Sequence, residues 1–360
     1  MFNQAIKALK ANRLKTTLIY FSLIFAIVAI FLITSISNGI ISMYSNMIKT
    51  DGDIIVTQAK ISDTFFSNVG VALIDKIKKI DGVKNATALI VGASPVEEIP
   101  IVAVYGVTDN RLKNYKLING EYPKNSEVIV GKPIYNQLED KTSIAIADMT
   151  FKVSGVYESD IGFENGGVVL TIKDAGEIFN KSASMLLISA KLDHKIEPIV
   201  NNIKKLSQKI DVKSTDNFVK NYNQFKIIKT SSYVISFIAF AMGLLGIVSI
   251  LSITINQRKS EFGILKAIGI STKRVVGTIM IESLLIGVLA YISAYFISNI
   301  IFYLIKNSEQ LQGYVNGEIS SQLALFVFIA SMTMTLIGAI IPALKAGKTD
   351  PIILIQGNAS

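Results

Sequence analysis

Four long stretches of the chain contain almost no charged side chain, and this feature constrains the fold more than any other. Residues 16–48, 230–257 and 319–344 have no Asp, Glu, Lys or Arg, and residues 275–305 have only Glu282. A helix needs about 20 apolar residues to cross a membrane, and its backbone must satisfy its own hydrogen bonds there. We therefore predict four membrane-spanning helices, near residues 17–38, 232–255, 276–305 and 321–344.

The first stretch is too long for the apolar region of a cleaved signal peptide. Such a region has about 7–15 residues and ends at a small-residue cleavage site. Residues 16–48 are 33 uncharged residues in a row, without an A-x-A pattern. A helix of that length reaches about 50 Å, beyond the ~30 Å hydrocarbon core. We expect a retained span that continues outside the membrane as a stalk.

The distribution of charge orients these predicted spans, because cytoplasmic loops carry an excess of Lys and Arg. Residues 1–15 have four basic side chains and no acid, and residues 258–274 have five against one. The segment 49–229 is nearly balanced, with 24 basic and 22 acidic residues. We expect both termini and residues 258–274 in the cytoplasm and residues 49–229 outside. The net charge of +9 is then a signal of topology, and we do not expect nucleic acid as a partner.

The predicted fold class is a four-span α-helical bundle with an extracytoplasmic α+β domain. Its parts are an N-terminal cytoplasmic helix with the first span and stalk (1–48), the extracytoplasmic domain (49–229), the second span (230–257), a cytoplasmic loop (258–274), the third span (275–305), a short external loop (306–318), the fourth span (319–344) and a cytoplasmic tail (345–360).

Periodicity within residues 49–229 predicts two strand–helix–strand halves around a β-rich insertion at about 108–183. Apolar patterns predict strands at 53–58, 83–91, 99–107, 185–191 and 212–215, and amphipathic helices at 71–80 and 197–210. Turn signals such as Asn119-Gly120 divide the insertion into short strands. Phe218, Tyr222 and Phe225 have the spacing of one helix face, which predicts helix packing; a ligand-binding aromatic box is the less favoured alternative.

The composition excludes several kinds of chemistry. The chain has no cysteine, so it has no disulfide and no thiolate metal site, and its one histidine, His194, excludes a site with several histidines. It contains no phosphate-binding loop, dinucleotide-binding, zinc-protease or nucleophile-elbow motif. We predict no catalytic, cofactor-binding or metal-binding residue in this chain, and we interpret His194 as an exposed turn residue.

Glu282 is the single charged residue inside a predicted span. Acids within membranes are costly and are by default functional. Glu282 follows Arg274 by eight residues, which is about 12 Å of helix, so we place it near the cytoplasmic interface. We favour a structural or interhelical pair with a basic side chain, and a role in moving substrate or protons stays open.

Three segments at the expected cytoplasmic positions together resemble one family. Residues 5–18 read AIKALKANRLKTTL, residues 258–272 read RKSEFGILKAIGIST, and residues 342–356 read PALKAGKTDPIILIQ. The second is similar to R-x-x-E-[IF]-[GA]-[ILV]-[LM]-[KR]-A-[ILM]-G-[AI]-[ST], and the third to P-A-x-x-A-x-x-x-[DN]-P-x-x-x-[LI]. The chain resembles FtsX-like, MacB-type ABC transporter permeases, which include macrolide exporters and lipoprotein-releasing permeases. Residues 126–138 and 151–159 also resemble the family's β-rich subdomain, although residues 139–141 (Glu-Asp-Lys) stand where the family often has Gly-Asp.

The resemblance implies a non-catalytic permease subunit of a bacterial cytoplasmic (inner) membrane. Its implied partners are an ABC ATPase subunit, which would bind the ATP and Mg²⁺, a second permease copy or paralogue, membrane lipid, and a periplasmic or outer-membrane protein. ATP-driven closure would then do conformational work outside the membrane, called mechanotransmission, for export or lipoprotein release. The positions that the resemblance assigns to ATPase coupling are Arg258, Glu261, Phe262, Gly263, Leu265, Ala267, Gly269 and Ser271, and those of the tail motif are Pro342, Ala346, Asp350 and Pro351.

The residues of the loop fit a docking element. Residues 258–268 can form a helix that ends at Gly269, with Ser271 as the next N-cap. We expect Phe262, Leu265 and Ile268 on one side of it as apolar contacts. The alternative is an amphipathic segment that lies on anionic lipid.

Other functional classes fit the chain less well. A membrane-anchored extracytoplasmic binding or sensor protein without an ATPase partner is the main alternative, although the tail is too short for an output domain. A secondary transporter or channel would need paired polar spans or repeats, and an extracytoplasmic enzyme would need a convergent site. Three questions stay open. They are the identity of the substrate, whether the chain controls a cell-wall hydrolase instead of exporting a compound, and whether it forms a homodimer or a heterodimer.

Overall fold

The computed structural model describes residues 13–139, 141–159, 161–308 and 317–348. Internal contacts divide the chain into two compact units. Of the described residues, 13–37, 230–303 and 317–348 form the spanning unit, and those within 38–229 and 304–308 form the outer unit. The division falls inside three helices, α2 (Arg13–Asp51), α9 (Asn223–Gln257) and α11 (Thr272–Lys306), and each is one uninterrupted helix.

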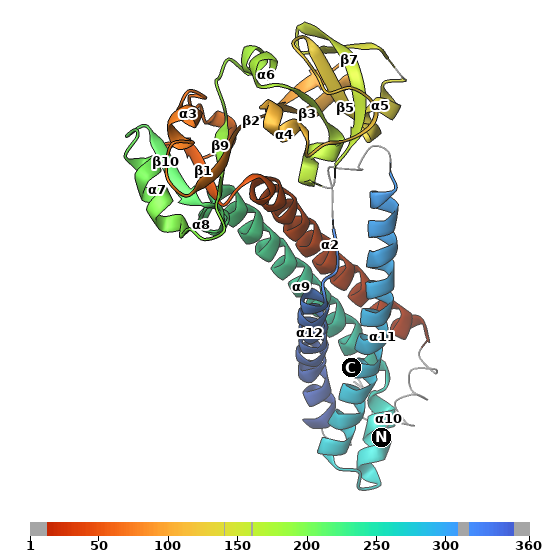
Figure 1. Cartoon of the computed structure of the whole chain (residues 1–360). Helices are drawn as coiled ribbons and strands as arrows, with labels where there is room; N and C mark the ends of the chain where they lie inside the picture. Colours follow the sequence, from red (N-terminus) through yellow and green to blue (C-terminus); the bar gives the residue numbers. More distant parts are fainter. Residues whose placement is uncertain (1–12, 140, 160, 309–316, 349–360) are drawn as a thin grey trace. The chain divides into compact units, whose positions relative to one another are not determined.

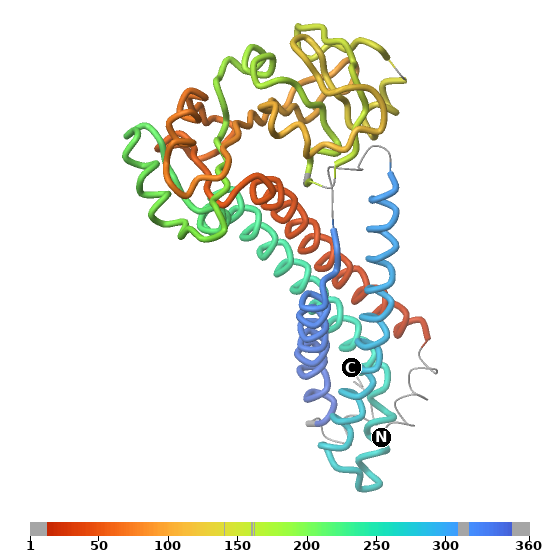
Figure 2. The backbone as a smooth tube through the Cα atoms, in the orientation of Figure 1, coloured from red at the N-terminus to blue at the C-terminus, as the bar shows by residue number. Residues whose placement is uncertain are grey.

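The four predicted spans are confirmed as four long apolar helices. They are α2, α9, α11 (Thr272–Lys306) and α12 (Ser321–Lys348), and each is long and apolar enough to cross a membrane. Figures 1 and 2 show these helices, with the short α10 (Lys259–Ala267) between α9 and α11. Each helix is longer than the span predicted for it. The extra turns lie at one or both ends of the predicted span.

Small residues bring the helices of the spanning unit close together. A Cβ atom at Gly246 of α9 would collide with the Ser22 side chain of α2, and one at Gly243 would meet Met334 of α12. Side chains from all four helices form the core here, including Leu23, Ile247, Ala290 and Val327. Close backbone approach is the usual packing of helices in lipid, where no hydrophobic force favours helix contact.

The outer unit contains one ten-stranded mixed sheet with short helices. Its strands are β1 (Ile54–Gln58), β2 (Val83–Val96), β3 (Ile99–Val107), β4 (Lys116–Gly120), β5 (Glu127–Gly131), β6 (Ser143–Ile146), β7 (Met149–Glu158), β8 (Gly167–Thr171), β9 (Met185–Ala190) and β10 (Ile210–Ser214). The strand order is β10-β1-β9-β2-β3-β8-β5-β7-β4, and β6 pairs with β2 and β7. The helical elements are η1 (Thr64–Phe66), α3 (Leu73–Ile77), α4 (Asp109–Leu112), α5 (Lys132–Gln137), η2 (Gly162–Gly166), α6 (Ile172–Phe179), α7 (Ile196–Lys204) and α8 (Thr215–Asn221).

The two predicted strand–helix–strand halves are β1-α3-β2 and β9-α7-β10. They pair through the antiparallel contacts β1–β9 and β2–β9. The β-rich segment extends this same sheet. The first half of the 14-residue β2 pairs with β9 and its second half with β3, which then pairs in parallel with β8. One long strand therefore connects the two halves to the β-rich part (Figure 1).

Strands in the middle of the sheet are buried on both faces. In β1, Ile54 and Val56 contact the core under α3 and α7, whereas Ile55 contacts a second core that includes Ile48 of α2. This follows from the two-residue period of a strand. The helix predicted for residues 197–210 is shorter than expected: α7 ends at Lys204, and Ile210 pairs with Gln58 as the first residue of β10.

Candidate functional site

The segment predicted to couple to an ATPase forms a separate short helix, α10, held between α9 and α11. The backbone N–H of Arg258 donates to Thr254 at 3.2 Å and to Ile255 at 3.1 Å, which ends α9. The carbonyl of Arg258 accepts the N–H of Phe262 at 3.1 Å, which begins α10. Arg258 itself has φ −98° and ψ 11°, outside the helical region. The change of helix direction therefore occurs at Arg258.

One side of α10 is anchored in the spanning unit. Phe262 is 2 % exposed and Gly263 is buried, while Leu265 is partly buried. They pack in a small core that also contains Val275 of α11 and Ala346 of α12. Burial of the Phe262 ring fixes this side of α10 against the spanning helices.

The opposite side of α10 is exposed in the part of the chain that the structure describes. Ile264 is 55 % exposed and Ile268 is 71 % exposed. Glu261 and Ala267 are exposed beside them, because residues three, four and seven apart share one face of a helix. We call Glu261, Ile264, Ala267 and Ile268 the α10 outer face. It is a small apolar surface with an acid at one end.

The predicted grouping of apolar contacts on α10 was wrong. Phe262, Leu265 and Ile268 do not lie on one side, since Phe262 and Leu265 pack inwards and Ile268 points outwards. The physical reason is that α9, α11 and α12 all pack against the side of α10 that carries Phe262 and Leu265, and they bury it. Ile264, which the resemblance did not select, lies beside Ile268 on the outer face.

A glycine cap ends α10 as predicted. Gly269 has φ +89°, a conformation that glycine adopts without steric cost. Its N–H donates to Lys266 at 3.0 Å, and the N–H of Ile270 donates to Leu265 at 3.0 Å. This pair of hydrogen bonds is the Schellman motif, in which the flanking apolar residues also meet. Leu265 and Ile270 do pack on the same core. Ser271 is the residue that precedes α11.

The C-terminal end of α10 is tied to α12. The Lys266 Nζ donates to the carbonyl of Gly347 at 3.0 Å, and the Thr272 hydroxyl donates to the same carbonyl at 2.9 Å. Of the tail motif, Pro342 is buried inside α12, and Ala346 is 3 % exposed in the core under α10. Asp350 and Pro351 lie outside the described residues, as does the greater part of the basic segment 5–18.

Glu282 of α11 forms the predicted pair with a basic side chain. Its Oε2 accepts a hydrogen bond from Arg258 Nη1 at 3.0 Å, and the whole residue is 6 % exposed. The same guanidinium binds both carboxylate oxygens of Glu261, at 2.8 and 3.2 Å. It also lies 4.8 Å from the centroid of the Phe262 ring. Arg258 therefore connects α10 to the single acid inside a predicted span.

The outer unit contains a buried ionic cluster that the sequence did not predict. Arg111 of α4 is fully buried and binds Asp51, the last residue of α2, at 2.5 Å and Glu164 of η2 at 2.5 Å. Burial raises the pKa of the Glu164 carboxyl, while the charge of Arg111 acts to lower it. No local pattern marks these three residues, because they are more than 50 positions apart in sequence and meet only in the fold.

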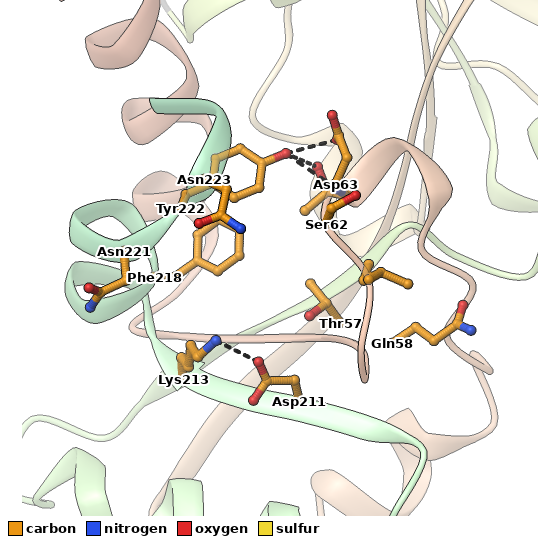
Figure 3. A pocket seen from close by; sticks show the side chains of 12 residues that line it. Thr57, Gln58, Ser62, Asp63, Asp211, Lys213, Phe218, Asn221, Tyr222 and Asn223 are labelled. Atoms are coloured by element: carbon orange, nitrogen blue, oxygen red, sulfur yellow. Dashed lines mark hydrogen bonds and ion pairs between the residues drawn. The ribbon is translucent and has the colours of Figure 1, made fainter. Parts of the chain in front are cut away.

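A polar pocket also lies in the outer unit, beside the aromatic residues that precede α9. Figure 3 shows it between β1, η1, β10 and α8, and its volume is about 90 Å³. The hydroxyl of Tyr222 binds Asp63 at 2.8 Å and accepts the N–H of Thr64 at 3.3 Å. Lys213 and Asp211 pair at 2.6 Å on the opposite wall. The pocket offers hydroxyl, amide and carboxylate groups to a small polar solute.

The aromatic stripe packs as predicted but does not belong to one helix. Phe218 is in α8, Tyr222 is extended with ψ 122°, and Phe225 is in α9. All three are buried in the same core as Tyr44 of α2, whose ring lies 5.8 Å from Tyr222 and 5.5 Å from Phe225. The break at Tyr222 lets its ring contact both neighbours while its hydroxyl reaches η1.

Within the described ranges, no three His, Asp or Glu side chains are grouped so that they could hold a metal ion. His194 is exposed in a turn, as predicted, with its Nε2 3.6 Å from Asp81. The features left as candidates for function are therefore α10 with its contacts, the ionic cluster and the polar pocket.

Comparison with known proteins places both parts of the chain in one family. Residues 16–206 match the MacB-like periplasmic core domain, and residues 233–351 match the FtsX-like permease C-terminal domain. A Staphylococcus epidermidis protein described as a hemin transport system permease, HrtB, is 26 % identical over 257 residues, which is 69 % of each chain. An uncharacterized ABC transporter permease of Methanocaldococcus jannaschii is 25 % identical over 59 % of this chain and 57 % of its own length.

Two solved structures resemble part of the chain. The periplasmic region of MacB from Actinobacillus actinomycetemcomitans is 11 % identical and covers 48 % of this chain and 93 % of its own, with a TM-score of 0.39. The extracellular domain of YknZ, a transporter of Gram-positive bacteria, is 14 % identical and covers 41 % and 90 %, with a TM-score of 0.35. Because the MacB-like domain alone matches more than half of the residues, the chain belongs to the FtsX-like, MacB-type family of ABC transporter permeases.

Proposed function

We propose that this permease couples ATP hydrolysis by a separate ABC ATPase to conformational work on a substrate outside the membrane. The observation that supports this most is the α10 outer face. A short helix is fixed firmly on one side, and it leaves Ile264 and Ile268 exposed on the other. Apolar residues held on a rigid support are typical of a docking surface. We propose that this face contacts the ATPase.

The proposed topology follows from the charge distribution. With residues 258–274 in the cytoplasm, α10 is on the side where ATP is available, and residues 49–229 are outside. The division into units supports a mechanical link, because α2 and α9 each run uninterrupted from the spanning unit into the outer unit. We propose that movement started at α10 reaches the outer unit along these helices, in an assembly with a second permease subunit.

Affinity purification from native membranes tests the proposal. We expect the tagged full chain to capture an ATPase, and the variant with Ile264→Asp and Ile268→Asp to lose it, because two carboxylates would enter an apolar contact. The matched control is Leu192→Asp, which changes the most exposed large apolar residue of the outer unit and should retain the ATPase. If the folded wild type captures no ATPase, the chain is instead a membrane-anchored binding or sensor protein.

The class of substrate needs a separate test. The relative that is described as a hemin permease makes hemin the first compound to try. We propose export as the reaction, so hemin should stimulate ATP hydrolysis by the reconstituted complex if this chain shares that substrate. Stimulation by a lipoprotein instead would indicate lipoprotein release.

A further inference from the structure

Arg258 contacts three helices, and one of its partners is Glu282, the acid inside α11, for which the proposed coupling gives no role. Its backbone ends α9 and begins α10, and its side chain reaches Glu282 of α11. Three helices therefore meet at one arginine. The orientation of α10 depends on where this guanidinium is held.

The two acids that bind Arg258 are not equivalent. The side chain of Glu261 is 54 % exposed, whereas the side chains of Arg258 and Glu282 are 10 % and 8 % exposed. Exposed ion pairs are screened by water and contribute little. Removing one partner of a buried pair leaves an uncompensated charge and is strongly unfavourable. Glu282 is thus the acid that determines the position of the guanidinium.

Glu282 has no other hydrogen-bond partner for its carboxylate in the part of the chain that the structure describes. Its Oε2 binds Arg258, and its Oε1 is buried without a partner among the described residues. It lies in α11 on the buried side, beside Ile279 and Ser283. The cost of an acid at this depth is therefore offset mainly by the contact with Arg258.

We propose that Glu282 is a positioning residue, which holds Arg258 and thereby fixes the orientation of α10 and its outer face. The positioning role does not depend on the proposed function. Only its consequence does, which is that the ATPase binds a preformed surface. Phe262 anchors the middle of α10 and the Lys266 contact with Gly347 anchors its C-terminal end. Glu282 supplies the anchor at the N-terminal end.

A spin label on α10 tests this without any ATPase. The chain has no cysteine, so Ser260→Cys introduces a single labelling site at an exposed position of α10. We expect Glu282→Gln to increase the mobility of the label in the full chain in membranes. Arg258→Gln should increase it equally, and the double variant should go no further than either single one. The control Glu318→Gln, at an exposed acid, should leave the spectrum unchanged.

The double variant also covers the case in which one buried charge without its partner prevents folding. It removes both charges, which is far better tolerated than removing one. A label in the double variant that is as immobile as in the wild type would overturn the proposal. Additive effects of the two single variants would overturn it too, because residues that act through one contact are not additive.

A second measurement separates positioning from general structure. Glu282→Gln should weaken the apparent affinity of the permease for purified ATPase at least about fivefold, the lower end of typical coupling effects. The rate of ATP hydrolysis at saturating ATPase should be unchanged. Equal affinity of variant and wild type would contradict the proposal. If the wild type binds no ATPase, the proposed function fails, and the label mobility still decides whether Glu282 positions α10.

Discussion

Arg111 is a cation without exposed surface, and it lies between Asp51 and Glu164, whose side chains are 3 % and 0 % exposed. Its Nη1 also donates to the hydroxyl of Tyr115, and Asn114 binds the second oxygen of Asp51 at 2.8 Å. The cluster joins the end of α2 to α4 and η2. It shows how one residue can connect segments that are distant in sequence.

At the residue scale, we predict that Arg111→Met destabilises the outer unit strongly. The two acids would remain buried without a counter-charge, and the loss of one partner of a buried pair costs about 3–5 kcal/mol. The control is Lys132→Met, which breaks the exposed pair with Glu158 and should cost under about 1 kcal/mol. Hydrogen exchange of β1 and β8 in the full chain measures the difference. Equal protection in the two variants would show that the cluster is not stabilising.

The helix α10 depends on its two ends as much as on its apolar side. Arg258 begins it, and the cap at Gly269 ends it. Among the described residues, no atom beyond Gly269 and its chain neighbours lies within 4 Å of the Cβ position at Gly269, so a side chain would fit there without collision. What an added Cβ would disturb is the positive φ alone.

At the scale of the element, we predict that Gly269→Ala loosens the last turn of α10. An alanine in the left-handed region costs roughly 1–2 kcal/mol, and the hydrogen bonds from Gly269 and Ile270 would weaken. Faster amide exchange at these two residues is the expected result. Gly70→Ala is a suitable control, because it also has open space around its Cβ but no positive φ; unchanged exchange in Gly269→Ala would contradict the role of the cap.

On the scale of the whole molecule, the continuity of α2 and α9 is the property that matters for the proposed mechanism. Both helices belong partly to the spanning unit and partly to the outer unit. The helix α2 has 39 residues, so a helical connection exists without any flexible linker. Such a connection transmits movement only while it stays helical.

We predict that a Gly-Ser-Gly insertion after Asn38 in α2 weakens the coupling between the two units while both stay folded and α9 stays intact. ATPase capture should persist, because the α10 outer face is unchanged. The ATP-dependent change in hydrogen exchange of the outer unit should fall at least about fivefold, since allosteric coupling usually has that size or more. The same insertion after Gln208, in the turn between α7 and β10, is the control. A full ATP response with the α2 insertion would contradict transmission along α2.

Much of this protein was predictable from sequence because its strongest signals are local. Uncharged stretches predicted the four spanning helices, and short apolar segments predicted β1, β3 and β9 to within one residue. The segment 258–272 carried the family resemblance that both domain matches confirm. The helix stop at Gly269 was predictable too, because it depends only on the backbone freedom of glycine.

Other features were decided only in the tertiary structure, because they depend on which surfaces meet. The inward side of α10 is selected by α11 and α12, so Ile264 is exposed and Phe262 is buried. The break at Tyr222 follows from contacts with Tyr44 and η1. The buried pairs Arg258–Glu282, Arg111–Glu164 and Arg111–Asp51 join residues 24, 53 and 60 positions apart. Only the fold brings these charges together, and once they are buried an unpaired charge would be costly.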